Sequence, residues 1–204
     1  VVGLSLGTTR EELYRATVEA VACGTRAVLD SFVRAGVVCE RLVLSGGIEH
    51  NRLWQQVTVD VLGREAEIVE GDNLTLRACA VIAATGAGHV ASLDEGAALF
   101  APRTRTLTPD PARHAVYRQT YDDYVGLLPS EPRMLQAYGV NIKYRRYSSP
   151  RVAEIIATVS GALKRSWPIR RDPLNLYTVW LDLGDEFVPL NWSAGAAEMP
   201  FRDG

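Results

Sequence analysis

The chain has 204 residues, of which 47% are hydrophobic, and its 22 basic and 24 acidic side chains give a net charge of −2 at pH 7. This length and apolar content suffice for one domain with an appendage or for two small domains. The balanced charge excludes a general attraction to nucleic acid or to an anionic membrane, so a nucleotide ligand requires a local site.

The cysteines and the hydropathy pattern limit the classes of protein further. Cys23, Cys39 and Cys79 are odd in number and show no CxxC spacing, which argues against a disulfide framework and a zinc site and favours a cytoplasmic compartment. The scattered histidines predict no metal site. The longest uncharged apolar run, residues 78–88, is too short to span a bilayer. The chain begins in mid-pattern without Met, and we interpret its N-terminus as a truncation point.

The first predicted element is a long helix with one face of small and apolar residues. Thr9 precedes Glu12 by three residues, the spacing at which a hydroxyl and a carboxylate cap each other's backbone donors at a helix start. Apolar and small residues then recur at steps of three and four up to Phe32, and Gly36 supplies a left-handed stop.

A pair of glycines separates the next strand from the next helix. Residues 41–45 read as a short buried strand that leads into Gly46 and Gly47, and the helical pattern resumes at Asn51 and runs to Gly63. Glycines at such a corner let the backbone approach a ligand closely, and the N–H groups of the following helix favour phosphate. A Gly-Gly pair taken alone is most often a plain turn, so other features must support this interpretation.

The remaining elements alternate between strand and helix and predict an α/β layer structure. We expect a further strand at residues 66–69 and a small-residue helix at residues 76–84. A short helix with a second capping box should follow Ser92. A last helix should follow Asp110, which serves as its N-cap and precedes a proline.

Two prolines, Pro129 and Pro132, interrupt the pattern after the last helix, so we predict one domain over residues 1–128 and an unassigned extension over residues 129–204. Within this extension an amphipathic helix follows Pro150, and residues 177–183 have the character of a strand.

Four segments in order carry a resemblance to a known family: GLSLGTTREELYRATVEAVACGTR, LVLSGGIEHNRLWQQVTVDVLG, RACAVIAATGAG and YRQTYDDYVGLL. Together they resemble the C-terminal, nucleotide-side domain of the FGGY carbohydrate kinases, such as xylulokinases, ribulokinases and polyol kinases, over about residues 1–127. The resemblance implies an actin-like, ribonuclease-H-like ATPase half-fold with a mixed sheet flanked by helices, to which the tail adds an α+β extension.

The resemblance also implies where a nucleotide binds. In this family the glycine pair lies against the nucleotide, so Gly46 and Gly47 would contact the phosphate and ribose side of ATP and Asn51 would lie near adenine. Mg²⁺ would be held mainly by the N-terminal half, which precedes everything in this chain. Gln56 and Asp60 match further family positions, and we assign them to helix packing and polar support.

The chain departs from the family pattern at several points. Residues 78–80 are Ala-Cys-Ala where the family usually has Gly-Ala-Ala, so a methyl group enters where close helix packing is expected, and nucleotide affinity should fall. Residues 5–9 imitate the family's phosphate loop without its aspartate and are interpreted as a structural decoy. We assign no catalytic residue, because Asp60, Asp122 and Asp123 lie on amphipathic helices where carboxylates are usually solvated or capping.

Three functional hypotheses remain open. The favoured one is a fragment of an ATP-dependent pentulose or polyol kinase, which transfers phosphate to an alcohol group and whose partners are a nucleotide and, in the intact parent, a sugar or polyol. The second is a non-catalytic interaction module or inactive kinase remnant, with homodimerisation left open. The third uses the basic and aromatic residues 143–147 to bind nucleic acid. Such clusters are usually solvated or ion-paired, so we expect no nucleic-acid partner, and we expect no membrane partner.

Overall fold

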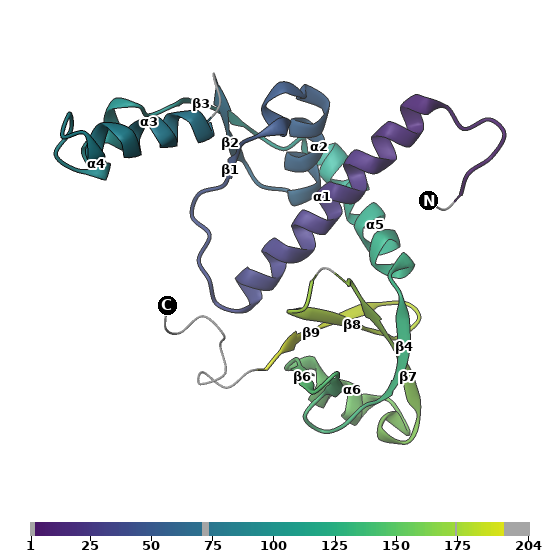
Figure 1. Ribbon diagram of the computed structural model, residues 1–204. Helices are drawn as coiled ribbons and strands as arrows, with labels where there is room; N and C mark the ends of the chain where they lie inside the picture. The colour runs from purple at the N-terminus through teal and green to yellow at the C-terminus, as the bar shows by residue number, and fades with distance from the viewer. Residues whose placement is uncertain (1–2, 71–73, 174, 194–204) are drawn as a thin grey trace. The chain divides into compact units, whose positions relative to one another are not determined.

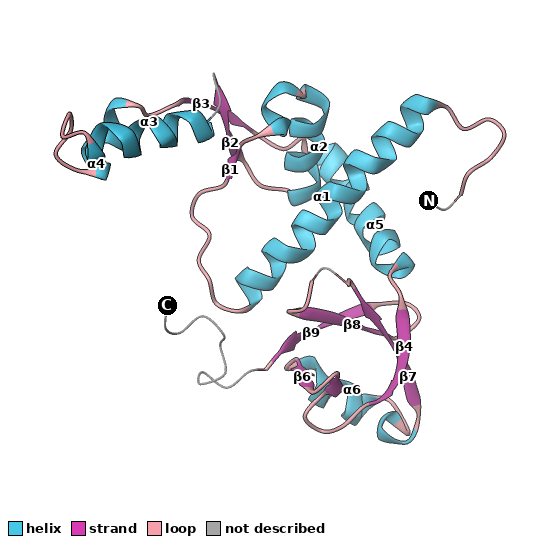
Figure 2. Cartoon of the chain, viewed as in Figure 1, coloured by secondary structure: helices cyan, strands magenta, loops and turns pink. Residues whose placement is uncertain are grey.

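The computed structural model describes residues 3–70, 74–173 and 175–193. The chain divides into two compact units, each made from two stretches of sequence. The first unit combines Val1–Ala22 with Cys39–Tyr117, and the second combines Cys23–Val38 with Arg118–Gly204. Figure 2 shows that both contain helices and strands. The boundary between residues 128 and 129 stays a prediction.

The long first helix, α1 (Arg10–Arg34), contributes residues to both units. Its predicted capping box is confirmed. The Thr9 backbone N–H donates to Oε2 of Glu12 at 2.8 Å, and the Glu12 N–H donates to Oγ1 of Thr9 at 3.2 Å. The predicted stop is also confirmed, because Gly36 has φ +84° and the left-handed conformation ends the helix.

The first unit is built on a small mixed sheet of strand order β1-β2-β3 (Figure 1). The strands β1 and β2 pair in parallel, and β3 pairs antiparallel with β2. The sheet and its helices have these bounds: β1 Val43–Leu44, η1 Gly47–His50, α2 Arg52–Leu62, β2 Ala66–Glu70, α3 Leu74–Gly86, α4 Leu93–Leu99 and β3 Arg103–Leu107.

The core of the first unit lies mainly between α2 and β2. Val57, Val59 and Val61 of α2 and Ile68 of β2 are all at most 3% exposed. The helix α3 differs, because none of its residues is buried. Its Ala78 is exposed, so the close helix packing expected there is absent from the structure.

The last helix of the family-like segment is α5 (Pro111–Leu127), which begins in the first unit and continues into the second. The predicted cap is confirmed, since Oδ1 of Asp110 accepts hydrogen bonds from the N–H groups of Ala112 at 2.9 Å and Arg113 at 3.1 Å. At the start of α4 the Ser92 half of the predicted capping box is confirmed, since its Oγ accepts from the Glu95 N–H at 3.1 Å, whereas the Glu95 carboxylate accepts from the Ala91 N–H at 2.7 Å and not from that of Ser92.

The second unit contains a six-stranded antiparallel sheet of order β4-β7-β8-β9-β6-β5. One face buries an apolar core with the short helix α6, including Val152 and Ile155 of the helix and Leu181 and Leu190 of the sheet. The bounds are β4 Ser130–Met134, β5 Val140–Ile142, β6 Arg145–Ser148, α6 Arg151–Thr158, η2 Ala162–Lys164, β7 Ser166–Arg171, β8 Thr178–Asp182 and β9 Phe187–Trp192.

The predicted α+β character of the extension is confirmed by this sheet and helix. The helix expected after Pro150 is α6, and the strand expected at residues 177–183 is β8. The helix ends earlier than its apolar pattern indicates, because Val159 adopts an extended conformation and caps α6.

Candidate functional site

The glycine pair lies at the corner between β1 and α2, as predicted. Gly46 has φ +87°, a value that side chains rarely tolerate, whereas Gly47 has an ordinary φ and begins the 3-10 turn η1. A Cβ atom built on either glycine would meet no neighbouring heavy atom within 4 Å. The backbone at this corner therefore faces open space and is not covered by described side chains.

A pocket of about 410 Å³ adjoins this open backbone. Its volume falls within the range typical of small-molecule sites. It is lined by residues of the glycine corner, of η1 and of the first turn of α3, namely Ser45, Gly46, Gly47, Glu49, His50, Leu74 and Thr75. The glycine corner thus forms part of a concave surface of ligand size.

Glu49 fixes the shape of the glycine turn. Its Oε1 accepts a hydrogen bond from the Gly46 N–H at 2.6 Å, and the Glu49 N–H donates to the Gly46 carbonyl at 2.9 Å. This reciprocal pair closes the turn and consumes the N–H donor of Gly46. The backbone of Gly47 remains at the pocket wall.

A buried glutamine stabilises the glycine turn through hydrogen bonds to its carbonyl groups. Gln55 of α2 is 1% exposed, and its Nε2 donates to the carbonyl oxygens of Ile48 at 2.9 Å and Glu49 at 2.8 Å. Its Oε1 accepts a hydrogen bond from Arg105 of β3, and Arg105 also forms an ion pair with Glu70 at 3.1 Å. Gln55 therefore connects the ligand-facing turn to the sheet. Sequence reasoning missed this residue.

Asn51 has a structural task in addition to any ligand contact. Its Oδ1 accepts from the Trp54 N–H at 3.0 Å and caps α2, and its Nδ2 donates to the hydroxyl of Tyr14. Asn51 is not among the residues that line the pocket beside the glycine pair. Its expected place near adenine stays a prediction.

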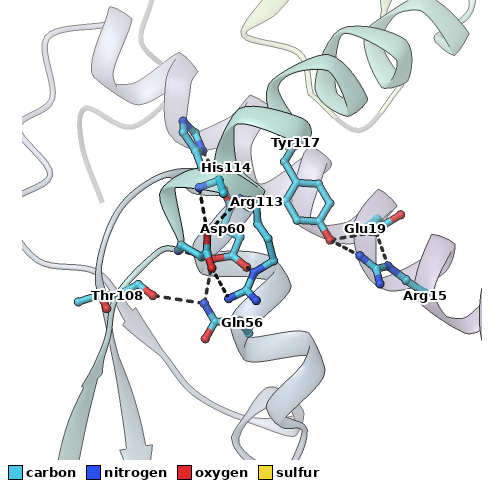
Figure 3. Close-up of polar contacts among 10 residues, drawn as sticks. Arg15, Glu19, Gln56, Asp60, Thr108, Arg113, His114 and Tyr117 are labelled. Atoms are coloured by element: carbon cyan, nitrogen blue, oxygen red, sulfur yellow. Dashed lines mark hydrogen bonds and ion pairs between the residues drawn. The ribbon is translucent and has the colours of Figure 1, made fainter.

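Asp60 is a buried centre of polar contacts in the first unit (Figure 3). Its carboxylate is 1% exposed and accepts from Gln56 Nε2 at 2.8 Å, from the Asp110 N–H at 2.8 Å and from Arg113 Nε at 2.6 Å. The hydrogen bond to Asp60 raises the pKa of Arg113. The prediction that Gln56 and Asp60 give polar support is confirmed, since these contacts join α2 to the start of α5. The Asp60 carboxylate thus accepts three hydrogen bonds from the surrounding protein.

A second polar group links α1 to α5 within the first unit (Figure 3). Glu19 Oε1 accepts from Arg15 Nε at 2.8 Å and from the Tyr117 hydroxyl at 3.0 Å. Burial, more than these neighbours, raises the pKa of Tyr117. These contacts hold the two helices together and lie outside the pocket.

The first part of the chain is similar to a domain of carbohydrate kinases. Residues 1–87 match the family model described as the C-terminal domain of the FGGY family of carbohydrate kinases. The resemblance that the sequence motifs predict is confirmed for this first part of the chain.

Relatives extend the similarity to about 62% of the chain. The ribulokinase of Anoxybacillus flavithermus is 33% identical over 133 residues, and that of Mycolicibacterium smegmatis is 36% identical over 128 residues. The crystal structure of xylulose kinase from Rhodospirillum rubrum matches 62% of this chain and 26% of its own, with 34% identity and a TM-score of 0.50. The likeness confirms the predicted actin-like fold class for this part. The chain spans about a quarter of the length of these curated relatives, 24% and 23% respectively.

Proposed function

We propose that residues 1–127 form the nucleotide-binding side of an ATP-dependent carbohydrate kinase that phosphorylates an alcohol group of a pentulose or polyol. The observation that carries this proposal is the pocket of about 410 Å³ against the open backbone of Gly46 and Gly47. The similarity to ribulokinases and to a xylulose kinase supports the choice of a pentulose as substrate class.

The residues at the corner fit part of an ATP molecule. Because Gly47 has no Cβ and faces open space, a flat or charged group of ATP can reach van der Waals contact with its main chain. A side chain at this position would prevent that contact. His50 and Thr75 add an imidazole and a hydroxyl to the lining, two groups that hydrogen-bond ribose or phosphate oxygens. The Glu49 carboxylate, held by the Gly46 N–H, repels phosphate at the other side of the turn and so favours ribose there.

Mg²⁺ has no ligand set in this part of the molecule. Residues 3–70, 74–173 and 175–193 contain no group of three or more His, Cys, Asp or Glu side chains that could hold a metal ion. We therefore assign to this chain the binding and orientation of the nucleotide, and no chemical step through the metal. In the proposed parent kinase, Mg²⁺ and the base that takes the hydroxyl proton belong to other residues.

We further propose a cytoplasmic location for the parent kinase. Cys23, Cys39 and Cys79 are all free thiols, which suits a reducing compartment. Among the described residues, no helix has the length and apolar character needed to cross a bilayer.

The proposal is tested by titrating the chain with a non-hydrolysable ATP analogue in a calorimeter. Gly47→Val places a side chain in the proposed ligand path, and the open surroundings and ordinary φ of Gly47 let the variant fold. We expect its affinity to fall at least tenfold. Gly86→Val makes the same chemical change on α3, also with open surroundings and away from the pocket lining, and should bind within twofold of the parent chain. No saturable binding at millimolar nucleotide, or equal losses in both variants, contradicts the proposal.

A second candidate function, a non-catalytic association module that forms homodimers, rests on the exposed apolar residues of α3 and α4. Leu76 is 67%, Ile82 63% and Leu99 70% exposed, and grouped apolar side chains on a surface mark association sites. Sedimentation of the chain and of the Leu76→Glu, Ile82→Glu variant tests it. A dimer that the double variant dissociates supports this function, and a monomer at all concentrations excludes it.

A further inference from the structure

The second unit contains a strongly basic stretch of sequence. Residues 133–171 include nine Lys or Arg side chains and a single acidic residue, Glu154. Three of the arginines have carboxylate partners, in the ion pairs Arg133–Glu131, Arg151–Glu186 and Arg170–Asp182. The other six cations have no ion pair with any described carboxylate: Lys143, Arg145, Arg146, Lys164, Arg165 and Arg171.

The antiparallel order of the sheet brings four of these cations to one end. The strand β6 begins at Arg145, with Arg146 next to it, and its neighbour β9 ends at the same edge with Trp192. The strand β7 ends at Arg171 beside the start of β8. Lys143 and Tyr144 form the β5–β6 turn there, both with positive φ. We call Lys143, Arg145, Arg146 and Arg171 the basic end.

The opposite end of the same sheet carries charges of both signs. The strand β8 ends there at Asp182, and the turn into β9 carries Asp185 and Glu186. Lys164 and Arg165 also lie there, before the start of β7, so positive and negative charges are mixed at that end. A polyanion would therefore be attracted more strongly to the basic end than to the mixed end.

Aromatic rings accompany the basic end. Phe32 of α1 and Tyr177 lie with ring centroids 6.5 Å apart, and Tyr177 and Trp192 lie 6.1 Å apart. Phe32 and Tyr177 are 45% and 46% exposed. We call these three residues the aromatic row. The guanidinium of Arg145 lies 5.4 Å from the centroid of the Trp192 ring and joins the row to the basic end.

The fifth residue of the predicted basic-aromatic cluster has a structural role. Tyr147 is 2% exposed, and its hydroxyl donates to the Leu176 carbonyl at 2.9 Å. Burial raises the pKa of Tyr147, and the positive charges of Arg145 and Arg171 act in the opposite direction. Both arginines therefore lie near Tyr147.

We propose that the basic end and the aromatic row bind single-stranded nucleic acid, with the cations against phosphates and the exposed rings stacked on bases. The cations supply charge complementarity, which a lipid surface or a duplex would also satisfy. The row of exposed rings selects a strand with unstacked bases, because base stacking on aromatic side chains contributes to affinity for any base. The sequence alone favoured a solvated or ion-paired cluster, because only the strand order brings Arg171 to the same end of the sheet as residues 143–146.

The test is fluorescence anisotropy of the whole chain with a labelled twelve-nucleotide poly(U) strand in 50 mM salt. Four phosphate contacts predict that log K falls with log salt at a slope of about −3. Lys143→Gln should reduce this slope by about 0.7. Tyr177→Ala should weaken binding about fivefold or more through lost stacking. Lys164→Gln is the matched control, because Lys164 lies exposed before β7 at the opposite end of the sheet and has no ion pair within the described ranges.

The outcomes separate the competing explanations. The proposal is supported if poly(U) binds, if Lys164→Gln leaves its affinity within twofold, and if Tyr177→Ala weakens it while thermal melting is unchanged. Absence of saturable binding overturns the proposal. Equal effects of the Lys143 and Lys164 variants also overturn it, since they would indicate diffuse charge attraction. Binding of a duplex or of phosphatidylglycerol vesicles as tightly as poly(U), with no effect of Tyr177→Ala, assigns the surface to another partner and excludes base stacking.

Discussion

Replacement of Asp60 by alanine should destabilise the first unit through the loss of one buried acceptor. The carboxylate accepts from three donors, and the Asp110 N–H loses its partner when the carboxylate is removed, at a cost of about 1–3 kcal/mol. Gln56 keeps a hydrogen bond to the Thr108 carbonyl at 3.2 Å. Arg113 is 51% exposed, so water replaces the lost ion pair and its loss adds only about 0–1 kcal/mol. The total is about 1–4 kcal/mol.

For a chain of this size that loss lowers the melting temperature by about 2–16 °C, measured by far-ultraviolet circular dichroism. Asp122→Ala is the control, because this exposed carboxylate on α5 should change the stability by no more than about 0.5 kcal/mol. Affinity for the ATP analogue should be unaltered at temperatures where Asp60→Ala remains folded. Equal melting temperatures for both variants would refute the structural role of Asp60.

Three further predictions concern the surroundings of the site. Gly63→Ala should lower the urea midpoint by the equivalent of about 1–3 kcal/mol, because φ is +63° and the new Cβ would lie 2.4 Å from the His114 ring; an unchanged midpoint contradicts this. Hydrogen bonds from Arg41 lower the pKa of Glu67 to about 2, so its stabilisation is complete above the unfolded value of about 4.3 and is lost as pH falls towards 2. Glu67→Gln should flatten the melting temperature between pH 5 and 2, and an unaltered profile would rule out this ion pair as its cause. Gln55→Leu should weaken ATP-analogue binding about tenfold in calorimetry by releasing the glycine turn, and full affinity in a folded variant would show that the turn holds without it.

The helices were predictable because their signals are local. The capping box at Thr9 and Glu12, the Ser92 cap and the Asp110 cap each act within one helical turn, so the sequence alone contains the interaction. The glycine corner was predictable for the same reason, since a short strand, two glycines and a helix follow one another directly.

Several strands were not predicted, because their stability comes from partners distant in sequence. The residues of β3 alternate Arg and Thr without an apolar face, and the strand forms by pairing with β2. Pro132 indicated a break, yet it lies in the edge strand β4 opposite Pro168 of β7. Proline has no N–H to donate, and an edge strand tolerates this because one of its sides has no neighbouring strand to receive a hydrogen bond.

At the candidate site, the sequence indicated the glycines but not Gln55. A glutamine within an amphipathic helical pattern is usually solvated, and only the fold brings it beneath the carbonyls of the turn. For Asn51 a capping signal was present, since it directly precedes the helical pattern and Trp54 follows three residues later. The family resemblance predicted a ligand role for Asn51 and did not indicate its role as the N-cap of α2.

The most direct test of a nucleotide site at the glycine corner is the set of backbone amide NMR shifts recorded while an ATP analogue is added. We predict saturable shifts of the Gly47 and Thr75 amides at concentrations that match the calorimetric affinity. Unchanged amides at residues 45–50 and 74–75, with shifts confined to other parts of the chain, would contradict the account.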